Sequence, residues 1–242
     1  APADDDPPVE RQSMSRHTAV AALLTGLALA GTPAFAITST CYGTVSRGRL
    51  QDGVALPVDG PNFTPYSRLG VALGRTHVHA QVAEIVADAY ASLARRTPEI
   101  RYVYGESGWP SGGRFRPHRS HQNGLSVDFF VPVRDADGRS VALPTGVGNQ
   151  WGYDIDFDAD ARWGAYRIDF DALAEHLLEL HRAATARGLG IAQVIFDTAY
   201  LPRLFATAHG ADVRRQLHFM QGKPWVRHDE HYHVDFAVPC KP

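Results

Sequence analysis

Two stretches of the sequence place apolar residues at helical spacing. Between residues 78 and 93, apolar side chains recur every three or four positions with polar residues between them. The same pattern returns over residues 172–187, where Asp171 is a candidate N-cap and Gly188 a stop signal. The pattern therefore predicts two amphipathic helices.

Four other segments have the length and residue types of strands. IRYVYGE (100–106) and HYHVDFAV (231–238) alternate, whereas LSVDFFVPV (125–133) and AQVIFD (192–197) are short apolar runs. The Pro- and Gly-rich stretch from 42 to 70 is expected to be a surface loop. Residues 133–169 lack a sustained period, as is typical of a long excursion at the border of an active site. We expect one α+β domain with a small, mainly antiparallel sheet flanked by helices and long loops.

The N-terminal region has the features of an export signal. Residues 14–36 combine an early arginine, an apolar run and the small-residue stretch TPAFA, which predicts cleavage after Ala36. The apolar run is too short to cross a bilayer core of about 30 Å as a helix. Residues 1–13 are rich in Pro and Asp and are interpreted as a disordered leader or an over-extended gene model. The expected product is a single domain, 37–242, in the periplasm or secreted, without a stable membrane anchor.

Composition and cysteine content narrow the picture further. The chain has 242 residues, of which 44% are hydrophobic and 21% charged, as in ordinary globular proteins. A net charge of −2 gives no electrostatic case for nucleic-acid binding. In an exported protein, Cys41 and Cys240 are expected to form a disulfide, the alternative being two unpaired thiols.

The histidines near the C-terminus cluster at strand spacing. His231 and His233 would project from one face of a strand with Cα atoms about 6.6 Å apart. At that distance, one can hold a metal ion while the other acts on water beside it. Asp235 would share this face.

A second cluster lies between Pro117 and Phe130. An extended chain from His121 to Asp128 would span roughly 23 Å and end on the opposite face. The chain must therefore fold back for these two side chains to meet, and Gly124 tolerates the backbone angles that such a turn needs. We expect His121, on a loop, to approach Asp128 on the strand.

Two histidines, one carboxylate and an open position form the usual ligand set of a catalytic zinc site. Other catalytic patterns are missing from the sequence: G-x-S-x-G, the phosphate-binding G-x-x-x-x-G-K-[ST] and H-E-x-x-H. The interpretation that remains is a zinc hydrolase.

SHQNGLSVD followed by HDEHYHVDF resembles the penicillin-insensitive murein endopeptidases, within the lysostaphin and D-Ala-D-Ala metallopeptidase superfamily. The resemblance rests on H-x6-D followed far downstream by H-x-H. It implies one zinc ion per chain, with peptidoglycan peptide stems as the partner. It also implies the ligands: His121, Asp128 and His233.

The resemblance further implies that His231 is the general base that takes a proton from the attacking water. His228 and His118 match histidines that line the family's site. His228 is the candidate second donor to the oxyanion, and His118 is expected to orient or bind substrate.

Three more residues are candidates for substrate binding. Arg116 and Arg119 flank His118 and could receive a peptide carboxylate bidentately. Glu106 could bind a substrate amine or accept a hydrogen bond from a zinc histidine. The alternative for all three is an ordinary solvated surface side chain.

The function expected from these residues is a zinc-dependent endopeptidase that hydrolyses peptidoglycan cross-links of the D-alanyl to diaminopimelyl type. One alternative is a carboxypeptidase or dipeptidase that releases D-Ala with the same metal site. Another is a secreted zinc-containing cell-wall binding protein without turnover, although such a protein would not need His231 and His228.

Overall fold

The computed structural model describes residues 38–222 and 224–242, which belong to one compact unit. The predicted leader and signal peptide lie outside these residues. Within the described ranges, no helix has both the length and the apolar character needed to cross a membrane.

The central sheet has five strands in the order β12-β13-β7-β6-β4. All neighbours are antiparallel except β4 and β6, which are parallel. The four segments with strand patterns form β6, β7, β12 and β13, so these predictions and the mixed α+β class are confirmed. The strands are β4 (Phe63–Pro65), β6 (Tyr102–Tyr104), β7 (Ser126–Phe130), β12 (Gly190–Ile195) and β13 (His231–Ala237).

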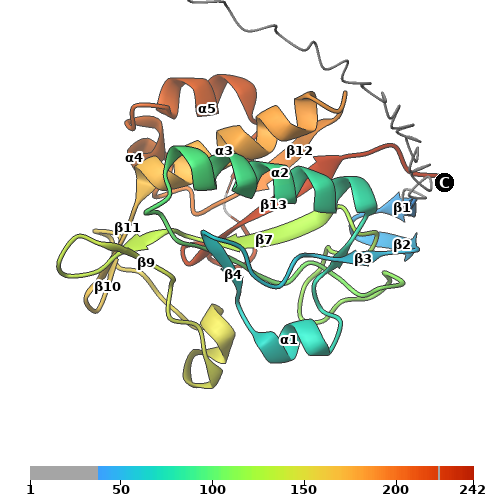
Figure 1. Cartoon of the computed structure of the whole chain (residues 1–242), viewed down its shortest axis with the longest axis horizontal. Helices are drawn as coiled ribbons and strands as arrows, with labels where there is room; N and C mark the ends of the chain where they lie inside the picture. Colours follow the sequence, from blue (N-terminus) through green and yellow to red (C-terminus); the bar gives the residue numbers. More distant parts are fainter. Residues whose placement is uncertain (1–37, 223) are drawn as a thin grey trace, which may run out of the picture. The chain divides into compact units, whose positions relative to one another are not determined.

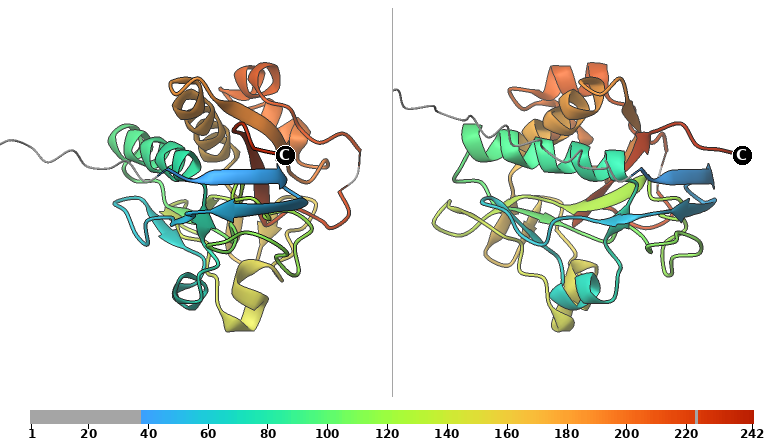
Figure 2. Two further views of the ribbon diagram at one scale, coloured as in Figure 1. Left: turned by 90° about the vertical axis from the view of Figure 1, so that its right-hand side faces the viewer. Right: turned by 45° about the vertical axis from the view of Figure 1, so that its right-hand side comes forward.

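Both predicted helices are present, and they lie side by side over one face of this sheet (Figures 1 and 2). Helix α2 (Ala80–Arg96) begins two residues later than the apolar period predicts. Val78 pairs in a short strand, and the His79 side chain caps the helix by accepting a hydrogen bond from the Gln81 backbone N–H (3.2 Å). The other face of the sheet is left for α1 (Arg68–Ala72) and for the site described below.

Helix α3 (Phe170–Thr185) starts earlier than predicted, and its N-cap is Asp169. The carboxylate of Asp169 accepts from the Ala172 backbone N–H (3.1 Å) and pairs with the Arg134 guanidinium (2.7 Å). The prediction that Asp171 is the N-cap was wrong, because the ion pair to Arg134 fixes Asp169 at the helix start and leaves Asp171 in the first turn.

Residues 42–70 do not form the expected surface loop. They contribute to several short strands whose sequences carry no apolar period, although Leu50 is buried in the core. The strands that take residues from this region are β4 of the central sheet, β1 (Thr40–Thr44), β2 (Arg47–Gln51) and β3 (Val54–Ala55), which pairs with β5 (His77–Val78).

The long excursion after β7 contains short elements. Four strands form a second sheet in the order β10-β11-β8-β9, and a 3-10 helix lies between β9 and β10. Two short helices follow β12. The elements are β8 (Val133–Arg134), β9 (Ser140–Val141), η1 (Val147–Gly152), β10 (Arg162–Trp163), β11 (Tyr166–Ile168), α4 (Leu201–Phe205) and α5 (Gly210–Gln216).

Strand alternation separates the core from the site. Tyr232 and Phe129 pack against His176 of α3, on the helix-covered face of the sheet. Their strand neighbours project from the opposite face, where His233 of β13 stands directly across from Asp128 of β7. The β7–β13 register therefore places a histidine beside a carboxylate.

The predicted disulfide between Cys41 and Cys240 is confirmed. It joins β1 to the segment that follows β13. The Lys241 backbone N–H also donates to the Cys41 carbonyl oxygen (2.9 Å), so hydrogen bonding supports the same junction.

Candidate metal centre

The chain folds back between His121 and Asp128, as the sequence predicts. Gly124 has φ +78, and a Cβ at this position would lie 2.8 Å from the His79 backbone nitrogen and 2.6 Å from a Leu50 methyl carbon. His121 also adopts a left-handed conformation, with φ +67, which is uncommon for a residue with a side chain. The turn brings His121 Nε2 to 3.2 Å from Asp128 Oδ1.

The ring of His121 is fully buried, and its two nitrogens differ. Nδ1 donates to the Ser107 carbonyl oxygen (3.2 Å), so Nε2 carries the lone pair of the neutral ring. Burial lowers the pKa of His121, which favours this neutral form. Nε2 has no hydrogen-bond partner among the described residues, although it faces the Asp128 carboxylate. Two electron-rich atoms facing each other in a buried site fit a cation between them.

Asp128 is the point on which the cluster converges. Its Oδ1 lies 2.9 Å from His233 Nδ1, and its Oδ2 accepts a hydrogen bond from the Tyr153 hydroxyl (3.0 Å). His118 Nδ1 and His231 Nε2 lie 3.5 Å and 3.8 Å from Oδ2. Burial opposes ionisation of this carboxyl, but the surrounding histidines hold its pKa well below the usual range. Asp128 is therefore ionised although it is buried, and a carboxyl group must be ionised to bind a metal ion.

The structure brings two histidines next to the pair His121 and Asp128. The ligand atoms of His118, His121 and Asp128 all lie within 4.8 Å of one another, a grouping that could hold a metal ion. His233 is the third ligand implied by the sequence. Its Nε2 donates to Asp235 Oδ1 (2.8 Å), which leaves Nδ1 directed at Asp128. A histidine held by a carboxylate in this way is a common arrangement at metal sites.

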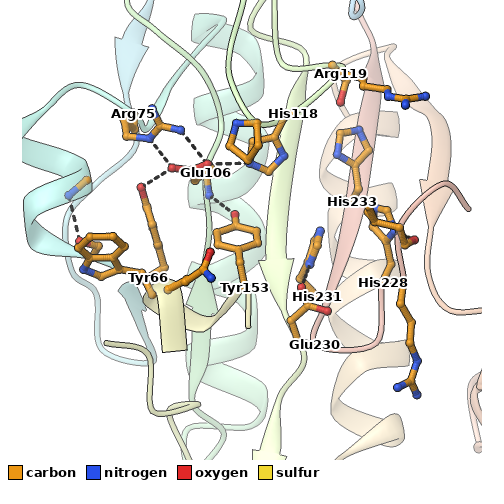
Figure 3. A pocket seen from close by; sticks show the side chains of 18 of the residues that line it. Tyr66, Arg75, Glu106, His118, Arg119, Tyr153, His228, Glu230, His231 and His233 are labelled. Atoms are coloured by element: carbon orange, nitrogen blue, oxygen red, sulfur yellow. Dashed lines mark hydrogen bonds and ion pairs between the residues drawn. The ribbon is translucent and has the colours of Figure 1, made fainter. Parts of the chain in front are cut away.

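Glu106 holds His118 in place through a hydrogen bond to its ring (Figure 3). His118 Nε2 donates to Glu106 Oε2 (2.6 Å), while the Tyr66 hydroxyl (2.8 Å) and Arg75 (2.9 Å) also donate to this carboxylate. Burial would raise the pKa of Glu106, but the hydrogen bonds from His118 and Arg75 outweigh it and lower the pKa to about 2. Both oxygens of Glu106 are therefore already engaged by protein donors.

His231 and His228 lie on the other side of the pocket (Figure 3). His231 Nδ1 donates to Glu230 Oε1 (2.8 Å), so Nε2 is the free nitrogen on the Asp128 side. Burial opposes protonation of His231, but the charges of Glu230 and Asp128 outweigh it and raise its pKa. His228 Nδ1 donates to the Val226 carbonyl oxygen (2.9 Å), and burial lowers the pKa of His228 to about 4.

The cluster opens into a cleft of about 760 Å³. Its lining includes the polar side chains of the cluster and four apolar side chains that are exposed: Leu69, Leu73, Trp225 and Val226. Arg119 lines the cleft, whereas Arg116 lines an adjoining recess.

Three contributors to the site were missed from the sequence. Tyr153, which holds Asp128, comes from the long excursion and carries no motif. Arg75 likewise carries no signal. Glu230 lies inside the HDEHYH block, but it precedes His231 directly, and neighbours on a strand point to opposite faces. Because β13 begins only at His231, Glu230 is outside the strand and can reach the ring.

A family model described as penicillin-insensitive murein endopeptidase matches residues 41–241. No curated protein matches the chain.

Proposed function

The chain belongs to the penicillin-insensitive murein endopeptidase family, and from this premise we propose that it is a zinc-dependent enzyme that hydrolyses peptide cross-links of peptidoglycan. The bond we assign is that between D-alanine and diaminopimelate. The place of action is the periplasm, in keeping with the disulfide and the predicted export signal.

The observation that carries the proposal is the unpartnered Nε2 of His121 beside the buried Asp128 carboxylate. With His233 Nδ1, these atoms supply two imidazole nitrogens and one carboxylate oxygen, the donor set that zinc takes in hydrolases. When bound, zinc would supply Lewis acidity that polarises the scissile carbonyl and lowers the pKa of water toward roughly 7.

His231 is the proposed general base. Its Nδ1–H is committed to Glu230, so Nε2 is free to take a proton from the attacking water and then deliver it to the leaving amine. The Glu230 carboxylate stabilises the imidazolium form of His231 between these two transfers. The Tyr153 hydroxyl holds Asp128 in place throughout.

His228 remains the candidate second donor to the oxyanion, under one condition. Its Nδ1–H is occupied by Val226, so Nε2 can donate only when the ring is protonated. The pKa of about 4 keeps the ring neutral near pH 7. The negative charge that develops on the carbonyl oxygen would have to raise this pKa for His228 to act.

The test uses purified protein spanning residues 37–242, loaded with zinc and incubated with cross-linked muropeptide dimers. We expect about one zinc per chain and conversion of dimers to monomers, read by mass spectrometry. His121→Ala should lose the metal, whereas His231→Ala should keep it and lose turnover by roughly 10²–10⁴-fold.

The masses of the products separate this function from its alternatives. Loss of a single alanine with the dimer intact would indicate a carboxypeptidase. Zinc binding without any product would favour a cell-wall binding protein. Full activity after thorough removal of the metal would rule out zinc dependence.

A further inference from the structure

A second hollow adjoins the cleft on the side of His118. This basic recess has a volume of about 460 Å³. Six residues line it: Arg114, Arg116, Pro117, His118, Arg119 and Gln122. Three of the six carry guanidinium groups, and no carboxylate from the described part of the chain lines it.

The three arginine side chains are exposed and uncommitted. Across residues 38–222 and 224–242, none of them forms a salt bridge or donates a side-chain hydrogen bond. By contrast, Arg75, which lies on the other side of Glu106, is fully engaged in an ion pair. The guanidinium groups of the recess are therefore available to a ligand without breaking an ion pair or a side-chain hydrogen bond.

The recess and the cleft share a wall. Pro117, His118 and Arg119 line both hollows, and Arg119 also lies over the Trp225 ring, with its Cζ atom 5.9 Å from the ring centroid. A peptide that occupies the cleft beside His118 can therefore place a side group in the recess. Arg119 therefore stands at the border between the two hollows.

We propose that this recess is a carboxylate-binding subsite, which takes a free carboxylate of the peptidoglycan stem next to the scissile bond; this rests on the proposed function. A guanidinium group presents parallel N–H donors that match the two oxygens of a carboxylate. Three positive charges in a lining that has no carboxylate among the described residues also favour an anion over a neutral amide. The recess thus selects stems whose carboxylates are free over stems whose carboxylates are amidated.

The experiment compares two cross-linked dimers that differ only in their stem carboxylates, free in one and amidated in the other. We expect the zinc-loaded protein to cleave the free form with a kcat/KM about tenfold higher. The triple variant Arg114→Gln, Arg116→Gln, Arg119→Gln should lose this preference, because its KM for the free form rises to that for the amidated form. Because the groups are exposed, the preference should shrink as salt is raised above about 0.1 M.

A matched control removes the same charge elsewhere. Arg95, Arg162 and Arg167 are exposed, line neither hollow, and form no salt bridge in the part of the chain that the structure describes. Their triple replacement by Gln should keep the preference. Equal cleavage of the two dimers by the wild type, or an equal loss of preference in the control, would overturn the subsite.

Binding separates the subsite from the proposed reaction. The affinity of each dimer for the His231→Ala protein is measured by calorimetry, with and without the three recess substitutions. Tighter binding of the free form that depends on the recess arginines supports the subsite even if the wild type cleaves nothing, in which case only the proposed function fails. Cleavage that does not depend on the stem carboxylates would contradict the proposed subsite and would still support the proposed function.

Discussion

Each histidine of the site uses one ring nitrogen for a contact away from the cluster. The acceptors are carboxylates for three of the rings and backbone carbonyls for the other two: His118 to Glu106, His231 to Glu230, His233 to Asp235, His121 to Ser107 and His228 to Val226. These bonds fix the tautomer and orientation of each ring, so the second nitrogen is presented to the site without reorganisation.

The assignment of the third metal ligand can be tested by two substitutions. We expect His233→Ala to lose most of its zinc, because its Nδ1 is the nitrogen in contact with Asp128. His118→Ala should retain close to the wild-type zinc content, measured by mass spectrometry of the metal. The exposed His218 provides a control variant that should behave as the wild type. Loss of zinc in His118→Ala, with zinc kept in His233→Ala, would move the ligand role to His118.

Glu230→Gln should leave the metal in place and slow turnover by roughly ten- to a hundredfold. The Glu230 charge raises the pKa of His231, and the general base must be unprotonated to act. Removing the charge lowers that pKa, so the acid limb of the kcat profile should shift to lower pH. A purely structural role would reduce the rate without moving this limb, and an unshifted profile would contradict our assignment.

At the residue scale, residues that belong to a motif can be predicted from the sequence, whereas the residues that hold them in place cannot. Strand period and turn chemistry predict where His121, Asp128, His231 and His233 lie, and the family resemblance implies the role of each. Tyr153 comes from an irregular segment, and its contact with Asp128 depends on the path of a loop that no local rule sets. Supporting residues of this kind are visible only in the folded chain.

At the scale of elements, Glu106 ties together segments that are distant in the sequence. Tyr66 follows β4, Arg75 precedes β5 and His118 lies in the loop before β7, yet all three donate to this one carboxylate. Because the carboxylate is buried, its charge must be balanced by these donors. The cluster thus couples the position of His118 to the packing of α1 and β6.

This coupling predicts a pH-dependent contribution to stability. The pKa of Glu106 is about 2 in the folded chain against 4.5 in the reference state, so its contribution is present above pH 4.5 and is lost as the pH falls toward 2. Glu106→Gln should be less stable at pH 7 by roughly 3 kcal/mol, with the difference shrinking below pH 4.5. Urea unfolding of the metal-free protein at several pH values measures this gap. The same substitution at exposed Glu99 serves as the control, and a gap independent of pH would refute the prediction.

Elements with a long apolar period are predictable, and short ones are not. Helices α2 and α3 and strands β6, β7, β12 and β13 follow from period and residue type, because most of their apolar residues are buried. Strands β1 and β2 have only isolated buried positions, such as Cys41 and Leu50, and the rest of their residues are polar. Their pairing is set by the register of a hairpin and by contacts with the C-terminal segment, which a local pattern does not encode.

At the scale of the whole described unit, the metal centre and the disulfide involve different elements of the fold. The metal centre is carried by the β7–β13 pair and the loop before β7, while the disulfide joins β1 to the residues after β13. The sequence allows one intramolecular pairing, because it has two cysteines. The place of the bond in the fold does not follow from a local pattern, since 199 residues separate the two cysteines.

The double variant Cys41→Ser, Cys240→Ser should therefore lose stability and keep its chemistry. Closing so long a loop restricts the unfolded chain by roughly 5 kcal/mol, which corresponds to a fall in Tm of at most about 10–20 °C for a domain of this size. The hydrogen bond from Lys241 to Cys41 and the β1–β2 hairpin keep the junction aligned, so kcat at a temperature where the variant is folded should match the wild type. Calorimetry and dimer cleavage on the same sample check both halves. A variant that melts like the wild type would show that the disulfide does not stabilise the fold by restricting the unfolded chain, and one that is folded but inactive would show that the disulfide acts on the site.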